Sequence, residues 1–453
     1  MMYPIQGGQA APSLTPAATD TSNLMVTFDK LPEWIPKLLL LGFIANEAKL
    51  ALLLILIYIM NKSRDPVPEK PLCEGIAHTV QPGESLWAIG LMYGVTVDQL
   101  LAENPGITNP DLIHPGQIVC IPRESRKVSL TYLFGATSDQ YLAMLAKTQN
   151  SLNTVCPDFF GIDSGGGLMT APPGKLNRPF IDAVHKQNIR IVPFISNHWN
   201  RELGIAALRN RDSLSDQIAR AVELHNLDGA DIAIENVTHE HRDMYTDFAR
   251  LLREKIPRGK IVSSAVAANP RGFTLGWHGS YDYKRLSYYC DYLMIMNYDE
   301  SYPGGPEGPV SSSGFFNASI QYAFRQGVPK EKIVSGIPFF GRYWKKGEAV
   351  GGVGLAARDV EFLLANYQSS YYFDTAAQSA RALVTIKPGE PEPLIWGGRR
   401  MTAGTYTIWY DSPESTEYKL SVINGYDLLG AGSWALGQEI LSIWDFYKTV
   451  LNG

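Results

Sequence analysis

The sequence of 453 residues has few cysteines, little excess of either charge and only one long hydrophobic run. Four cysteines are too few for a fold held together by disulfides. A net charge of −5 and a pI near 6.0 give no basic surface that would capture nucleic acid or anionic lipid. One long apolar run excludes a membrane protein with several spanning helices. The hydrophobic fraction of 45% and the charged fraction of 19% are typical of folded globular domains.

The amino-terminal part of the chain is expected to lie outside the folded domains. Residues 1–37 are rich in Pro, Ala, Ser and Thr and predict a disordered tail. Residues 38–60 form the hydrophobic run, which has about the length of a transmembrane helix but is interrupted by Asn46 and Glu47. This run is interpreted as a membrane anchor, an amphipathic surface helix or two short hydrophobic helices. Residues 61–72 predict an extended linker.

Residues 73–123 have the pattern of a small β-α-α-β unit. A strand at residues 78–80 and a Gln-Pro-Gly turn lead to Ser85, which is a typical N-cap residue of a helix. Apolar residues at helical spacing follow. A second helix is predicted at residues 97–103 and a last strand at residues 118–121.

Several motifs make this unit resemble a LysM module over its full length: PGESLWAI, YGV, two Asn-Pro steps and HPGQIVCIP. The resemblance implies binding to N-acetylglucosamine chains of peptidoglycan or chitin, in a groove between two segments. The first segment comprises Gly83, Glu84, Ser85 and Leu86, and the second comprises Asn109, Pro110, Asp111, Leu112 and Ile113.

The four cysteines fall into two pairs with different expected roles. Cys73 precedes the first strand of the small unit and Cys120 lies in its last strand, so the two are candidates for a disulfide in an extracytoplasmic protein. Cys156 and Cys290 lie beside predicted buried strands and are expected to be inert core thiols. Their spacing does not suggest a metal site, and neither a metal nor a cofactor is expected.

Residues 126–453 alternate short apolar strands with helical segments. The eight candidate strands begin near residues 128, 158, 189, 228, 260, 291, 332 and 428. Eight strand–helix repeats in about 320 residues predict an α/β fold, the (β/α)8 TIM barrel. A small α+β insertion is expected at about residues 343–411, between the seventh and eighth strands.

The fourth candidate strand carries the most informative polar residues. It reads DGADIAIE from Asp228 to Glu235. With a two-residue period, Asp231, Ala233 and Glu235 share the inward face, while the isoleucines between them face the helices. Barrel chemistry takes place at the carboxyl ends of the strands, which makes Glu235 a candidate general acid. An ion pair between Glu235 and an Arg or Lys is the structural alternative.

This strand and later motifs resemble glycoside hydrolase family 18 over most of residues 128–453. That family carries Asp-x-x-Asp-x-Asp-x-Glu on its fourth strand. The match continues through MNYD at Met296, IPFFGRYW at Ile337 and GSWALGQE around Trp434. Glu-Asn-Val at Glu235 and the segment YPGGPEGPVSS resemble the bacterial spore-lytic branch, which often joins LysM modules to the barrel.

The resemblance implies substrate-assisted, retaining hydrolysis of N-acetylglucosamine-containing glycan without a metal or cofactor. Glu235 would protonate the leaving oxygen, Tyr298 would hold the attacking N-acetyl carbonyl, and Trp434 would form the floor beneath the sugar. The residues implied to be catalytic are Glu235, Tyr298, Asp231 and Asp228. Those implied to bind substrate are Met296, Asp299, Trp434, Tyr132 and Arg342.

One position departs from the family pattern, because the Asp two residues before the acid is Ala233 here. Losing one such stabilising group typically costs about 10²–10³ in rate. Asp231 lies about 13 Å down the strand from Glu235 and cannot take its place. Without the neighbouring carboxylate, Glu235 is expected to depend on burial alone to stay protonated. Asp163, after the second strand, is one candidate for a replacement carboxylate.

Three interpretations of function remain open. The first is a glycosidase, weakened at Ala233 or rescued by another carboxylate, and the second is a glycan-binding protein that has lost turnover. The third is a structural wall anchor in which the barrel is a spacer. Of these interpretations we expect the glycosidase, because Glu235, Tyr298 and Trp434 of the family pattern are all present. We also expect a monomer outside the cytoplasm, at the cell wall or spore, with peptidoglycan or chitin oligosaccharide as partner and no nucleic acid.

Overall fold

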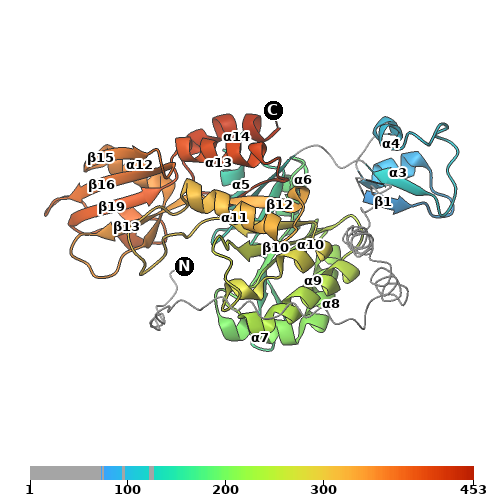
Figure 1. Ribbon diagram of the computed structural model, residues 1–453, viewed down its shortest axis with the longest axis horizontal. Coiled ribbons are helices and arrows are strands. Elements are labelled where there is room, and N and C mark those ends of the chain that lie inside the picture. The colour runs from blue at the N-terminus through green and yellow to red at the C-terminus, as the bar shows by residue number, and fades with distance from the viewer. Residues whose placement is uncertain (1–72, 74–75, 94–96, 122–126, 453) are drawn as a thin grey trace, which may run out of the picture. The chain divides into compact units, whose positions relative to one another are not determined.

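The computed structural model describes residue 73 and residues 76–93, 97–121 and 127–452. The tail, hydrophobic run and linker expected at residues 1–72 lie outside this set. In the described part of the chain, no helix is long and apolar enough to cross a membrane. The chain divides between Glu124 and Ser125 into two compact units, each described separately below (Figure 1).

The small unit has the predicted β-α-α-β order. Its elements are β1 (Ile76–Thr79), α3 (Leu86–Tyr93), α4 (Val97–Glu103) and β2 (Ile118–Ile121), and β1 and β2 pair antiparallel. The Ser85 side chain accepts a hydrogen bond from the backbone N–H of Ala88 at 3.2 Å, as expected of an N-cap residue. The apolar side chains of this unit form their own core, which comprises Val80, Leu86, Ile89, Leu100, Val119 and Ile121.

Two connections hold the last strand of the small unit in place. A disulfide joins Cys73 to Cys120, with a Cα–Cα distance of 5.1 Å. The Asn104 side chain, after α4, accepts a hydrogen bond from the Cys120 backbone N–H at 2.7 Å and donates one to the Cys120 carbonyl at 2.5 Å. The end of α4 and the strand β2 are therefore fixed to each other.

The large unit contains a closed barrel of parallel strands. Its second strand is broken into β4 (Thr154–Pro157) and β5 (Phe160–Ile162), and its third into β7 (Arg190–Ile191) and β8 (Phe194–Ser196). The strand β4 pairs with β7, and β5 pairs with β8, so the ladder closes across the break. The other barrel strands are β3 (Val128–Leu133), β9 (Gly229–Ala233), β10 (Ile261–Ala267), β11 (Tyr292–Met296), β12 (Ile333–Pro338) and β20 (Gly430–Trp434).

The predicted start of the second strand is corrected by this break. The sequence places that strand from Asp158, whereas its first half is Thr154–Pro157. Asp158 lies in the break between the two halves, where its carboxylate accepts hydrogen bonds from the Gly135 N–H and the Tyr141 hydroxyl and pairs with Lys175.

Helices pack around the outside of the barrel (Figure 1). Several of them begin at a side-chain cap, such as Asn177 before α6 and Ser312 before α11. The helices are α5 (Ser138–Leu145), α6 (Arg178–His185), α7 (Arg201–Arg209), α8 (Arg211–Leu224), α9 (Arg242–Lys255), α10 (Tyr283–Tyr289), α11 (Ser313–Arg325), α13 (Pro413–Gly425) and α14 (Trp444–Asn452).

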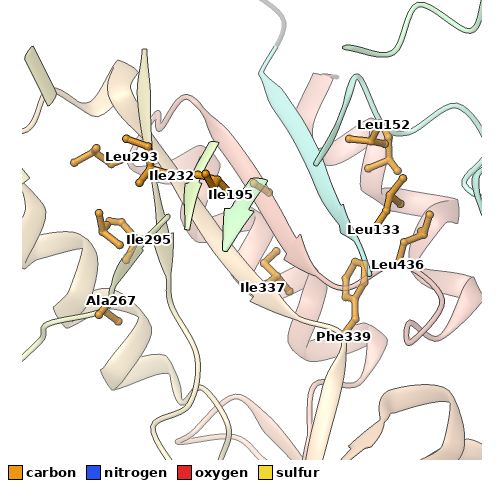
Figure 2. Close-up of a cluster of buried hydrophobic side chains, with 14 of the residues drawn as sticks. Leu133, Leu152, Ile195, Ile232, Ala267, Leu293, Ile295, Ile337, Phe339 and Leu436 are labelled. Carbon is orange, nitrogen blue, oxygen red and sulfur yellow. The ribbon is translucent and has the colours of Figure 1, made fainter. Parts of the chain in front are cut away.

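The barrel strands separate two hydrophobic layers. The outer layer packs between strands and helices and includes Ile232, Ile295 and Ile337 (Figure 2). The inner layer fills the barrel and includes Ala233 and Met294. Alternate residues of β9 thus face opposite layers, as the two-residue period predicts.

The insertion is a five-stranded antiparallel sheet with the strand order β14-β13-β19-β16-β15. The helix α12 (Ala357–Asn366) packs against this sheet. A two-stranded hairpin, β17 (Leu394–Ile395) and β18 (Arg399–Arg400), lies in the same stretch of chain. The five strands are β13 (Phe340–Lys345), β14 (Val353–Ala356), β15 (Gln368–Asp374), β16 (Ser379–Ile386) and β19 (Gly404–Tyr410).

Candidate functional site

Glu235 follows β9 at the carboxyl end of the barrel, and its backbone is held from two sides. The buried Asn197 side chain accepts a hydrogen bond from the Glu235 N–H at 2.8 Å and donates one to the Glu235 carbonyl at 2.7 Å. The Tyr281 hydroxyl donates to the carbonyl of Ile234 at 3.1 Å. Fixing the backbone on both sides limits the positions that the acid side chain can reach.

The environment of Glu235 favours its protonated form. Burial raises the pKa of Glu235 to about 8, and the negative charge of Asp299 adds to the shift. Within the described residues, no Arg or Lys forms an ion pair with the Glu235 carboxylate. The expectation that Glu235 depends on burial alone to stay protonated is wrong, because Asp299, in the loop after β11, adds like-charge repulsion. An acid protonated at neutral pH can act as a proton donor.

Asp299 and Arg342 form one wall of the site. Asp299 follows β11 with a positive φ of 64°, a conformation that is costly for a non-glycine residue. It accepts hydrogen bonds from the Arg342 guanidinium at 2.6 and 3.1 Å. The buried Arg342 also donates to the Gly352 carbonyl at 2.8 Å and lies 5.3 Å from the centroid of the Phe340 ring. The insertion strand β13 is thereby tied to the end of a barrel strand.

Tyr298 packs next to this wall. Its ring meets that of Phe340 edge to face at 5.7 Å. A Cβ atom at Gly336 would lie 2.9 Å from the Tyr298 ring and 2.6 Å from the Ile295 carbonyl, so a glycine is required there. Tyr298 and Met296 are both partly buried and pack against the inner layer of the barrel.

Trp434 lies at the end of β20 in a group of aromatic rings. Its ring centroid is 5.4 Å from Tyr132, 5.6 Å from Phe134 and 6.1 Å from Phe194. Trp434 is partly exposed and packs against the same inner layer as Tyr298. The partly exposed rings of Phe134 and Trp434 thus form an apolar, aromatic surface, and the buried rings of Tyr132 and Phe194 pack against Trp434.

Asp231 lies fully buried below this surface. Its two carboxylate oxygens accept hydrogen bonds from the Tyr132 hydroxyl at 2.8 Å and from the Ser263 hydroxyl at 2.7 Å. Burial raises the pKa of Asp231 to about 6, although both hydrogen bonds lower it. Asp231 is therefore connected to Trp434 through Tyr132, whose ring packs against the Trp434 ring.

The structure does not bring Asp228 to this site. Asp228 precedes β9 at the opposite, amino end of the strand. Its carboxylate accepts a hydrogen bond from the Ile191 N–H at 2.8 Å and lies 2.7 Å from His185 Nε2. These contacts fit a structural role at the base of the barrel.

Asp163 is also engaged elsewhere. Its carboxylate accepts hydrogen bonds from the backbone N–H groups of Gly165 and Gly167, both at 2.8 Å. These bonds close the turn between β5 and β6 (Leu168–Thr170). This arrangement does not support Asp163 as a replacement for the carboxylate missing at Ala233.

A strained loop after β8 was not fully anticipated from the sequence. His198 and Trp199 are successive non-glycine residues with positive φ, 48° and 63°. The Asn236 side chain donates to the Trp199 carbonyl at 2.9 Å, and the Trp199 ring meets Trp277 edge to face at 4.7 Å. The roles of Asn197 and Tyr281 in holding Glu235 were missed. The sequence contained one indication of the role of Asn197, because it is a polar residue directly after a barrel strand.

The small unit presents most of its predicted binding residues to solvent. Four residues of the second segment, Asn109 to Leu112, are exposed. Leu112 and Asn109 also line a hollow of about 550 Å³. In the first segment, Leu86 is buried in the core, and Glu84 accepts from the Gln81 N–H and pairs with His78, both at 2.7 Å.

The fold is a closed (β/α)8 barrel, in which an acid and a tyrosine follow the fourth and sixth strands and a tryptophan ends the eighth, at the end of the barrel where enzymes of this fold carry their active sites. The chain belongs to glycosyl hydrolases family 18, whose profile matches residues 137–439. The LysM domain profile matches residues 78–122. Both resemblances inferred from the sequence motifs are thereby confirmed.

Known proteins resemble the chain over much of its length. The sporulation glycosylase YdhD of Bacillus subtilis is 26% identical over 79% of this chain and 84% of its own. The cortical fragment-lytic enzyme of the same organism is 24% identical over 61% of this chain and 63% of its own. Among solved structures, the Bacillus cereus spore cortex-lytic enzyme SleL has a TM-score of 0.61 at 21% identity, covering 83% of this chain and 86% of its own. A Chromobacterium violaceum chitinase has a TM-score of 0.62 at 23% identity, covering 72% of this chain and 99% of its own. These structural matches support the predicted barrel fold.

Proposed function

We propose that this protein is a glycosidase that hydrolyses N-acetylglucosamine-containing cell-wall glycan, peptidoglycan or chitin. The observation that carries the proposal is the position of Glu235 just after β9, at the carboxyl end of the barrel, where burial and Asp299 raise its pKa. Membership of family 18 supports it, as do relatives named as cortical fragment-lytic enzymes and chitinases. The LysM domain supports a polymeric glycan as partner and a location at the cell wall or spore.

The proposed mechanism is substrate-assisted and retaining. Glu235 donates its proton to the glycosidic oxygen as the bond to the anomeric carbon breaks. The carbonyl oxygen of the substrate's own N-acetyl group attacks that carbon and forms a cyclic oxazolinium ion. Glu235, now ionised, then accepts a proton from the water that opens the ring. Tyr298 donates a hydrogen bond to the N-acetyl carbonyl, and Trp434 supports the sugar ring.

Ala233 limits the rate in this proposal. A carboxylate at this position would hold the N-acetyl N–H, and its loss costs on the order of 10²–10³ in rate. Asp299 contributes repulsion that keeps Glu235 protonated, but its carboxylate is hydrogen-bonded to Arg342. The alternative function is a catalytically inactive, lectin-like wall protein, and Ala233 is the residue that favours it.

Activity assays on three proteins separate these functions. The parent chain, Glu235→Gln and Ala233→Asp are incubated with N-acetylglucosamine oligomers and with peptidoglycan, and released reducing ends are measured. We expect slow release by the parent, none by Glu235→Gln, and release about 10²–10³ faster by Ala233→Asp.

Two outcomes would count against the enzyme. If Ala233→Asp cleaves while the parent does not exceed Glu235→Gln, the parent is a glycan-binding protein. If none of the three proteins cleaves either substrate, the proposed hydrolysis is wrong.

A further inference from the structure

A relay of two hydrogen bonds reaches the backbone just before Glu235 from the loop after β10. The Trp277 indole N–H donates to the Tyr281 hydroxyl at 2.8 Å, and this hydroxyl donates to the Ile234 carbonyl at 3.1 Å. Tyr281 and Ile234 are buried, whereas Trp277 is partly exposed. Because the hydroxyl accepts from the indole, its single proton is left to point at the Ile234 carbonyl.

The backbone just after Glu235 is held from the loop after β8. Asn236 has a positive φ of 60°, a conformation that few non-glycine residues adopt. Arg201 donates to the Asn236 carbonyl at 2.7 Å and to its side-chain oxygen at 2.9 Å. The Asn236 side chain in turn donates to the Trp199 carbonyl at 2.9 Å. These three hydrogen bonds hold an uncommon backbone conformation directly beside the acid.

An aromatic contact joins the two loops. The Trp199 ring meets the Trp277 ring edge to face at 4.7 Å. This contact closes a circuit that begins at the residue before Glu235 and ends at the residue after it. In order along the circuit lie Ile234, Tyr281, Trp277, Trp199 and Asn236. Because the members support one another, movement of the backbone at Glu235 would have to break contacts in both loops.

The circuit can act on Glu235 through its position but not through charge. Asp299, in the loop after β11, is the charged group that shifts the pKa of Glu235. The phenols of Tyr245 and Tyr281 also interact with Glu235, but burial raises the pKa of each well above the ordinary value of 10. Both phenols are therefore neutral at the pH at which Glu235 titrates.

We propose that Trp277 is a positioning residue for the proton donor and that, through Tyr281, it holds Glu235 in the place from which it donates. This inference rests on the proposed function, because it explains how the acid of that reaction is kept in place. The competing explanation is structural: Trp277 and Tyr281 serve only to stabilise the loop after β10.

The placement of Glu235 can be measured in the full-length protein without substrate. The protein is labelled with carbon-13 at the glutamate carboxyl carbons and titrated by NMR, and the Glu235 signal is identified by its loss in Glu235→Gln. The parent should show a pKa of about 8. Tyr281→Phe removes only the hydroxyl. If Glu235 is released towards water, its pKa should fall to about 7 or below.

Tyr283 provides a matched control. Its buried hydroxyl also donates to a backbone carbonyl, that of Ala267 at the end of β10, at 2.7 Å, and it has no part in the circuit. Tyr283→Phe should therefore leave the pKa of Glu235 unchanged.

A second variant tests the action of Trp277 through Tyr281. Trp277→Phe keeps an aromatic ring but cannot donate to the Tyr281 hydroxyl, so it should also lower the pKa of Glu235. When Trp277→Phe is combined with Tyr281→Phe, the pKa should fall by less than the two single effects together, because the two residues act in series.

Kinetics provide a second measurement on the same proteins. Tyr281→Phe should lower kcat for the release of reducing ends about tenfold and leave KM unchanged, because a displaced acid affects proton transfer rather than binding. Tyr283→Phe should change neither constant.

Each contrary result identifies what failed. If Tyr281→Phe titrates like the parent, or if Tyr283→Phe lowers the pKa of Glu235 equally, the role is structural and the proposed function stands. Additive effects of Trp277→Phe and Tyr281→Phe would exclude action of Trp277 through Tyr281. If Glu235 of the parent already titrates near the ordinary value, the inference and the proposed function fail together. If its pKa shifts as expected but the parent cleaves no glycan, the proposed function fails alone.

Discussion

At the residue scale, the site depends on the protonation of one carboxyl group. Glu235 follows β9 at the carboxyl end of the barrel, and burial contributes more to its raised pKa than the charge of Asp299 does. In the family pattern, an Asp on the same strand would supply such repulsion, but this chain has Ala233 at that position, and its side chain is buried. Under the proposed function, repulsion from Asp299 takes over one role of the missing carboxylate, which is to keep Glu235 protonated. It does not replace contact with the substrate.

The protonation of Glu235 can be tested through stability. Its pKa is about 8 in the folded chain, against about 4.5 for the ordinary group, so folding holds a proton that unfolding releases between these values. The free energy of unfolding should therefore fall by up to about 1.4 kcal/mol per pH unit between pH 5 and pH 8 relative to Glu235→Gln. Thermal or denaturant unfolding of both proteins across this range measures the difference.

The sign of this effect is distinctive. The stabilisation by the proton on Glu235 is fully present below pH 4.5 and is lost as the pH rises through 8. Above pH 8, the free energies of unfolding of the parent and of Glu235→Gln should change with pH in parallel. If the parent and Glu235→Gln show the same pH dependence, Glu235 has an ordinary pKa and the general-acid assignment loses its support.

At the element scale, short strands and tight connections position the functional residues. The third barrel strand is interrupted between β7 and β8, and the residues after β8 hold the backbone of Glu235. In the small unit, the disulfide and Asn104 attach the last strand to the rest of its fold. Among the described residues of the small unit, the core contains six buried apolar side chains, which provide little other stabilisation.

Reduction of the disulfide should therefore destabilise the small unit selectively. Cys73 and Cys120 are separated by 47 positions, and closing a loop of that size stabilises a fold by roughly 2–4 kcal/mol. Hydrogen exchange at the amides of Val119 and Ile121 should accelerate when reductant is added to the full chain. The amide of Val266 in β10 serves as control, because Cys156 and Cys290 are free thiols. Unchanged exchange at Val119 would show that the disulfide adds no stability.

At the scale of the whole molecule, the chain joins two units with separate cores. Under the proposed function, both bind the same class of glycan. Linking two binding units raises the retention on a polymer far above that of either unit, without changing the chemistry at the catalytic unit. The small unit is thus expected to govern attachment, and the barrel to govern turnover.

Separating the units tests this division of roles. Residues 127–453 alone should cleave soluble N-acetylglucosamine oligomers with kcat/KM within about twofold of the full chain. Retention on insoluble cell-wall glycan should fall by about tenfold or more. Pelleting assays and oligomer kinetics on the two proteins measure these quantities. If residues 127–453 show no affinity for muropeptides while residues 73–123 bind normally, the barrel is a spacer.

The sequence by itself determined the elements of both units and the identity of the central acid. Helical spacing, turn residues and the two-residue period of β9 are local properties, so they predicted the β-α-α-β unit, the barrel repeat and the inward position of Glu235. Only the tertiary structure decided how Glu235 is surrounded. The partners Asn197, Tyr281 and Asp299 come from other strands and loops, and Asp228, although part of the same motif, lies at the far end of its strand. Burial and charge act through space, so the pKa of a side chain depends on neighbours whose positions only the folded barrel sets.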